Sequence, residues 1–234
     1  AGYLTAYAER QGLLKRDEWS LLSREVSDYG SDTAVAEAIA REEPDLACFS
    51  LYLWNLDRSV HIASRVAALC PSGTPGASPF HVLVEGEGEL PFAALLGDLR
   101  RGKPLARRYA ADKPLDLLEV PNPYLAGTLP LEEDRPVHLE TMRGCPARCG
   151  YCYYGKNYPE IRRFPRADAE LVVELAGRAG AKEIYLMDPS FQATEDLPER
   201  LMGLARANKA GMSLHAELRL ESVTEELGRL SAAA

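Results

Sequence analysis

TMRGCPARCGYCYYGK, residues 141–156, is the segment from which the architecture of this chain is most directly inferred. It carries Cys145, Cys149 and Cys152 at C-x3-C-x2-C spacing, just beyond a predicted strand at 137–141. Glycine and proline residues beside these cysteines interrupt regular structure, so the three thiols are predicted to lie on a loop. A strand, a loop and then a helix begin a β/α repeat, which predicts a parallel sheet.

Three thiolates at this spacing satisfy three irons of a four-iron cluster and leave the fourth iron open, unlike the four-cysteine ligation of ferredoxins. An open iron can chelate a small-molecule cofactor. Two alternatives stay open. A structural zinc site usually takes a fourth Cys or His, which this segment does not supply, and buried free thiols would have no need of such a loop. The spacing therefore favours a 4Fe-4S cluster.

The sequence after the cysteines continues the β/α alternation. Strands are predicted at 137–141, 183–187 and 213–218, and helices at 166–179, 197–210 and 223–230. These are three βα units, whereas a closed barrel normally needs six or eight. We therefore expect residues 136–234 to form the N-terminal half of a barrel, and we expect the chain, which begins without Met, to be a fragment.

The sequence before the cysteines predicts a second α/β domain at 1–103. Helices are predicted at 4–11, 31–43, 57–69 and 90–101, strands at 45–54 and 81–85, a short edge strand or loop at 23–29, and a turn-rich break at 71–79. The nearly continuous apolar run at 45–54 is typical of a strand buried on both faces of a parallel sheet. The expected fold is a Rossmann-like, doubly wound parallel sheet. Residues 104–135, rich in proline and charge, are predicted to be a linker.

Composition narrows the function classes. Lys and Arg number 27 against 35 Asp and Glu, a net charge of −8, which disfavours attraction to nucleic acid or to an anionic membrane. No apolar window reaches the roughly 18 to 20 residues that a membrane span needs. Of five cysteines, three are packed into eight residues, which does not fit a secreted disulfide framework. We expect a soluble protein of the reducing cytoplasm.

The motif Cys145-x3-Cys149-x-Tyr151-Cys152 resembles that of the radical S-adenosylmethionine (SAM) superfamily, including the aromatic residue before the last cysteine. The resemblance implies that the three cysteines hold a 4Fe-4S cluster whose open iron binds SAM. One electron, from a donor such as flavodoxin or ferredoxin, would then cleave SAM to a 5′-deoxyadenosyl radical. It also implies that Tyr151 lies near the adenine and that the backbone at Tyr153 or Tyr154 meets it.

Further cofactor contacts are implied in the barrel half. Asp188 begins a D-x-x-F sequence after the second strand, where the superfamily positions the methionine amino group. The usual Gly-Gly-Glu type motif is absent, and D-x-x-F resembles the cobalamin-associated subgroup. The alternative is an Asp that caps the next turn. Glu217 and Arg219 lie nearest the catalytic end of the third strand. They would contact SAM or substrate, or form a salt bridge with each other or with a helix, and His215 is interpreted as structural.

The first domain resembles the cobalamin-binding domain that precedes the barrel in one large subgroup. The matching segments are 3–7, 44–55 and 85–89, with 121–125 in the linker. The resemblance implies that Tyr52, Asn55, Gly86 and Gly88 lie against cobalamin. Without a D-x-H-x-x-G motif, no histidine would ligate cobalt from below, so binding would be base-off. The subgroup's glycine-rich strand and helix between the positions of Cys70 and His81 are replaced by a short loop, which counts against cobalamin.

These resemblances imply a radical SAM enzyme acting on a small-molecule or peptide substrate that the sequence does not specify. With cobalamin, it would be a C-methyltransferase, although ring contraction and cyclisation stay open. One alternative is a radical SAM enzyme whose first domain is a lid without functional cobalamin. Another is a non-catalytic iron–sulfur or zinc module that binds a partner protein.

Overall fold

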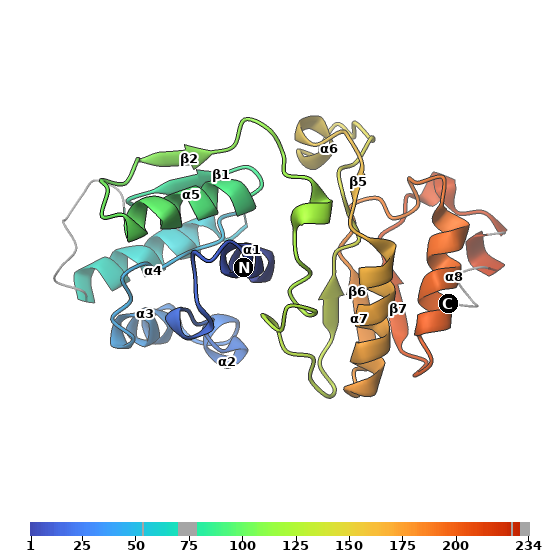
Figure 1. Cartoon of the computed structure of the whole chain (residues 1–234), viewed down its shortest axis with the longest axis horizontal. Coiled ribbons are helices and arrows are strands. Elements are labelled where there is room, and N and C mark those ends of the chain that lie inside the picture. Colours follow the sequence, from blue (N-terminus) through green and yellow to red (C-terminus); the bar gives the residue numbers. More distant parts are fainter. Residues whose placement is uncertain (53, 70–78, 226, 230–234) are drawn as a thin grey trace. The chain divides into compact units, whose positions relative to one another are not determined.

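The computed structural model describes residues 1–52, 54–69, 79–225 and 227–229 (Figure 1). Its contacts divide the chain into two compact units. Unit 1 comprises Ala1 and Ala8–Lys113, and unit 2 comprises Gly2–Tyr7 and Pro114–Ala234. Both units contain helices and a parallel sheet, which confirms the α/β class. The functional assignment of 1–103, 104–135 and 136–234 stays a prediction.

Unit 1 is mainly helical. Its elements are α2 (Arg24–Ser27), α3 (Asp32–Arg41), α4 (Leu56–Leu69), β1 (Leu83–Glu85), α5 (Glu89–Arg100) and β2 (Arg108–Ala110), with a 3-10 turn at Arg16–Glu18. Helix α1 (Gly2–Arg10) contributes its first part to unit 2 and the rest to unit 1. β1 and β2 pair in parallel, with Leu83 opposite Arg108.

The predicted helix at 31–43 is confirmed, and its start has a local cause. The hydroxyl of Ser31 accepts a hydrogen bond from the Ala34 N–H at 3.2 Å, which satisfies one of the amides left free at a helix start. Val35 of α3 is buried together with Ile62 and Val66 of α4, so these two amphipathic helices bury their apolar faces in one cluster.

Three expectations for the first half are corrected. The apolar run at 45–54 is not a strand at its described residues, 45–52 and 54. A parallel strand needs hydrogen-bonded neighbours, and in the described part of the chain β1 pairs with β2 instead. Residues 24–27 are a helical turn capped by Ser23, and the predicted linker contains strand β2. The turn-rich break at 71–79 lies almost wholly outside the described residues.

Unit 2 is built on three parallel strands in the order β3 (Val137–Leu139), β6 (Glu183–Leu186) and β7 (Ser213–Ala216). Helices α7 (Arg166–Arg178) and α8 (Leu197–Ala207) follow the predicted positions, and residues 225 and 227–229 are helical. The smaller elements are β4 (Met142–Arg143), β5 (Arg162–Arg163), α6 (Tyr154–Asn157) and 3-10 turns at Leu117–Glu119 and Leu220–Ser222. Among the described residues no closed barrel is formed, so the half barrel stays a proposal.

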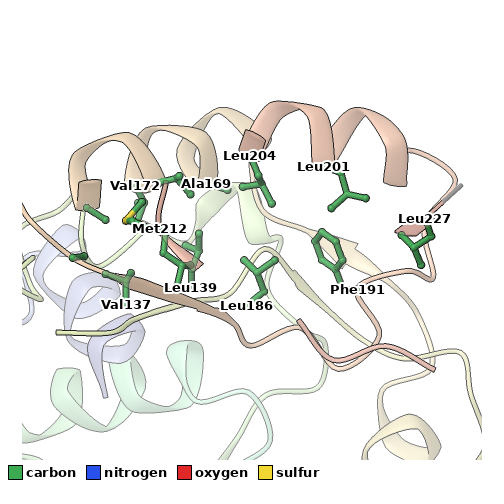
Figure 2. Close-up of a cluster of buried hydrophobic side chains, with 14 residues drawn as sticks. Val137, Leu139, Ala169, Val172, Leu186, Phe191, Leu201, Leu204, Met212 and Leu227 are labelled. Atoms are coloured by element: carbon green, nitrogen blue, oxygen red, sulfur yellow. The ribbon is translucent and has the colours of Figure 1, made fainter. Parts of the chain in front are cut away.

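The core of unit 2 follows from the alternation of side chains along its strands. Leu139 and Leu186 are opposite one another in the register of β3 and β6, and both are buried. Figure 2 shows them pointing toward the helices, where they meet Val172 of α7 and Leu204 of α8. Each such buried aliphatic side chain contributes about 1.5–3 kcal/mol. This core holds the ends of β3 and β6, from which the candidate site extends.

Candidate functional site

The three cysteines lie on an excursion of the chain that we call the cysteine loop, residues 144–161. Its two ends are joined by β4 and β5, which pair antiparallel with Met142 opposite Arg163 and Arg143 opposite Arg162. The Phe164 N–H also donates to the Thr141 carbonyl oxygen at 3.0 Å. We call this pairing the β4–β5 clasp. It holds the base of the loop beyond the end of β3, where the sequence predicted a loop but no paired strands.

Two glycines allow the cysteine loop to approach itself closely. Gly144 has a φ of +96°, and a Cβ there would lie 1.8 Å from the Glu160 carbonyl oxygen. A Cβ on Gly155 would lie 2.1 Å from the Ala147 carbonyl oxygen. These distances are far below contact distance, so only glycine fits at either position.

All three thiols of the loop are free. Cys145 is 8% exposed, and its N–H donates to the Tyr158 carbonyl oxygen at 2.8 Å, whereas Cys149 and Cys152 are half-buried. The Cys152 N–H donates to the Cys149 carbonyl oxygen at 3.1 Å. Within the part of the chain that the structure describes, no group of three His, Cys, Asp or Glu side chains could hold a single metal ion. By their chemical type, three free thiols on one loop match the ligands of a cluster with one open iron.

Arg219 lies within electrostatic reach of two of these thiols, those of Cys149 and Cys145. Its pKa is raised above the ordinary value, first because its guanidinium is hydrogen-bonded to the Glu221 carboxylate, and also through the negative charges of Cys149 and Cys145. The ion-pair partner of Arg219 is Glu221 and not Glu217, and a contact of Arg219 with SAM or substrate stays a prediction. Glu217 is exposed just after β7.

Tyr151 and Tyr153, which flank Cys152, are 94% and 77% exposed. The Tyr153 carbonyl oxygen accepts a hydrogen bond from the Asn157 side chain at 2.8 Å, and Lys156 Nζ donates to the Gly150 carbonyl oxygen at 2.8 Å. The backbone around both rings is thus held by the loop, while the rings stay accessible to a ligand. Their contact with adenine stays a prediction.

Asp188 lies two residues beyond β6 and is 1% exposed. Its Oδ1 accepts hydrogen bonds from the N–H groups of Thr141, at 2.7 Å, and Met142, at 3.0 Å. Its Oδ2 accepts from the Thr141 hydroxyl and from Arg200 Nη2, the latter at 3.1 Å. The carboxylate is thus bonded to the segment that leads into the cysteine loop. A contact with SAM stays a prediction.

The sequence interpretation missed Arg200, although a signal was present. Arg200 lies on the same face of α8 as Leu197, Leu201 and Leu204, at the i, i+3, i+4, i+7 spacing of core residues. A charged residue in that stripe predicts a buried partner, because an arginine is almost never fully buried unpaired. That partner is Asp188.

A second missed contact lies below the loop. Arg143 is 7% exposed and forms an ion pair with Glu140 at 3.1 Å. Its guanidinium carbon lies 5.5 Å from the ring centroid of Tyr3 and 5.4 Å from that of Phe164. Cation–π contact of this kind is favourable when it is desolvated, so these rings also stabilise the β4–β5 clasp.

The residues expected to contact cobalamin lie on two turns of unit 1. The Tyr52 N–H donates to the Asn55 side-chain oxygen at 2.7 Å, and the Asn55 side-chain nitrogen donates to the Ser50 carbonyl oxygen at 3.0 Å. The Tyr52 ring is stacked on Trp54 at 4.7 Å between centroids, and both rings are exposed. Asn55 thus shapes the turn that presents the two rings.

The second turn precedes α5. Gly86 has a φ of +79°, where only glycine is relaxed, but Gly88 has an ordinary φ of −76° and is the N-cap of α5. Only Gly86 therefore adopts a backbone angle that favours glycine. Their contact with cobalamin stays a prediction.

None of the helices in the described part of the chain combines the length and the apolarity that a membrane span requires.

No protein-family model matches the chain. The chain is 25% identical, over an alignment of 189 residues, to the cobalamin-dependent radical SAM methyltransferase TokK of Streptomyces tokunonensis. It is 24% identical, over 189 residues, to the 2-(S-pantetheinyl)-carbapenam-3-carboxylate methyltransferase of Streptantibioticus cattleyicolor. Each alignment covers 64% of this chain, which spans only 28% of the length of either relative. At low identity, then, the chain is similar to methyltransferases, one of them named as a cobalamin-dependent radical SAM enzyme.

Proposed function

We propose that the chain is part of a radical SAM methyltransferase in which Cys145, Cys149 and Cys152 hold a 4Fe-4S cluster. The observation that carries the proposal is that three free thiols lie on one glycine-containing loop. The base of this loop is closed by the β4–β5 clasp, beyond the first strand of a parallel sheet. Similarity to TokK supports it. When bound, such a cluster supplies the electron that cleaves SAM, with flavodoxin or ferredoxin in the cytoplasm as the proposed donor.

The residues of this chain would have separate tasks. The three thiolates hold three irons, and the Arg219 guanidinium lies within electrostatic reach of Cys149 and Cys145. Tyr151 and Tyr153 offer exposed rings beside Cys152 against which an adenine can stack. The proposed SAM contact of Glu217 is supported by its exposed position after β7.

Cobalamin is the methyl donor in the finer form of this proposal. The stacked rings of Tyr52 and Trp54 support a corrin site, because they present a flat apolar surface to solvent. The turn at Gly86 and Gly88, which leads into α5, would lie beside the same ligand. The substrate, a small molecule or a peptide, would receive the methyl group.

Anaerobic reconstitution with iron and sulfide tests the proposal. We expect about four irons and matching sulfide per chain, because a cluster with one open iron requires the whole cube. Cys149→Ala should lose the cluster. Cys48→Ala, which changes a free cysteine in unit 1, is the matched control and should retain the iron. One tightly bound zinc without sulfide would overturn the proposal.

A further inference from the structure

The buried contacts of Asp188 converge on the start of the cysteine loop. Thr141 and Met142, which donate to its carboxylate, precede Cys145 by four and three residues. Met142 is also the first residue of β4. A single side chain from the end of β6 therefore holds the strand from which the first cysteine emerges.

All the acceptor positions of the carboxylate have partners within unit 2. An ionised carboxylate offers about four lone-pair sites. Two N–H groups occupy Oδ1, and the Thr141 hydroxyl and the Arg200 guanidinium occupy Oδ2. At 1% exposure, the Asp188 side chain is also buried from solvent.

Arg200 extends the contact to a third element. It donates to the Phe191 carbonyl oxygen at 3.1 Å and to the Thr194 hydroxyl at 3.0 Å, and its guanidinium carbon lies 4.4 Å from the centroid of the Phe191 ring. With Asp188 it therefore ties α8 and the loop after β6 to the entry of the cysteine loop.

A contribution to the stability of the fold does not explain why Asp188 and Arg200 form a buried ion pair. Burial raises the pKa of Asp188 above its ordinary value and lowers the pKa of Arg200, and both shifts oppose the charged forms. A buried ion pair often contributes no more than apolar residues of the same volume would. What apolar residues could not provide is the directional bonding to two successive backbone amides.

We propose that Asp188 and Arg200 are positioning residues that fix Thr141 and Met142, and through them the place of the Cys145 thiol in the cysteine loop. Only the effect on a bound cluster rests on the proposed function. The order of the loop itself can be measured on the chain without metal.

The first test measures alkylation of each cysteine in the metal-free chain, resolved by peptide mass spectrometry. Asp188→Asn places an amide nitrogen, a donor, against Arg200 or the backbone amides. We expect it to raise the alkylation rate at Cys145 about tenfold, since a charge-assisted buried hydrogen bond is worth at least that factor in a local opening equilibrium. Thr141→Val, which removes only the hydroxyl, should raise the rate less. Cys48 of unit 1 is the internal reference and should not change.

Leu204→Ala is the matched control for general destabilisation. Leu204 is a core residue of the same α8 helix, with 3% exposure. When it is compared with Asp188→Asn at equal thermal stability, Leu204→Ala should leave the Cys145 thiol protected from alkylation. An equal rise in this control, or a parent-like rate in Asp188→Asn, would overturn the inference.

The second test is the electron paramagnetic resonance spectrum of the reduced cluster. We expect Asp188→Asn to bind iron but to give an altered spectrum, because one thiolate is displaced. A spectrum identical to that of the parent at full iron content would overturn the inference. If the parent chain itself took up no iron, the proposed function would fail, and the alkylation rates would still decide the positioning role.

Discussion

Gly144 is one residue on which the entry to the cysteine loop depends. In Gly144→Ala the new methyl group would overlap the Glu160 carbonyl oxygen, at 1.8 Å, and the backbone would keep an unfavourable φ of +96°. We expect a loss of about 3 kcal/mol and poor iron uptake. Gly150→Ala, on the same loop with open space around it, should change stability by less than about 0.5 kcal/mol. Urea unfolding and iron content measure both, and equal effects would contradict the argument.

We expect the buried Tyr3 to lower the free energy of unfolding at alkaline pH. Its pKa is strongly raised, first because burial disfavours the phenolate and then because of the charge of Glu140. The folded unit keeps Tyr3 neutral, whereas the unfolded chain ionises above about pH 10, which stabilises the unfolded state. The stability of the parent relative to Tyr3→Phe should therefore be constant below pH 10 and fall above it. Hydrogen exchange in β3 under urea would measure this, and a constant difference would contradict it.

At the scale of elements, three rings cross the sheet of unit 2 on the face opposite the core. His138, Tyr185 and His215 are opposite one another in the register of β3, β6 and β7, with ring centroids 5.6 Å and 4.3 Å apart. We expect Tyr185→Ala to cost about 1 kcal/mol through these cross-strand contacts. Tyr151→Ala, which removes a ring that is 94% exposed, should be near neutral.

A double-mutant cycle between Tyr185→Ala and His215→Ala would isolate the closer of the two ring contacts. We expect a coupling free energy of about 0.5–1 kcal/mol, since the rings are stacked with 7° between their planes. Additive effects would show that the rings are merely adjacent.

At the scale of the whole molecule, cobalamin binding should be weak. The resemblance implies that the nucleotide tail lies against a glycine-rich strand, which this sequence replaces with a short loop between Cys70 and His81. We expect hydroxocobalamin to bind this chain in a base-off form and more weakly than it binds TokK. The affinity for hydroxocobalamin can be measured by titrations followed by absorbance and by Trp54 fluorescence. Trp54→Ala is the control for the fluorescence signal. Comparable tight binding by both proteins would contradict the expectation.

Much of unit 2 could be predicted from the sequence because its signals are local. The alternating side chains of β3, β6 and β7 and the apolar stripes of α7 and α8 are set by the periods of strand and helix. The same holds for the N-cap at Ser31 and for the thiol spacing of Cys145, Cys149 and Cys152, each decided within a few residues. By itself, the sequence determined the α/β order and the cysteine loop.

The features that only the tertiary structure decided are contacts between residues far apart in the chain. Asp188 meets Thr141 across 47 positions, and the β4–β5 clasp pairs residues 21 and 19 positions apart, neither of which a local pattern encodes. The apolar run at 45–54 has the composition of a buried strand, yet its described residues have no ladder partner. The physical reason is the same in each case: hydrogen bonds between distant segments depend on which surfaces the core brings together, and composition and period describe only one segment at a time.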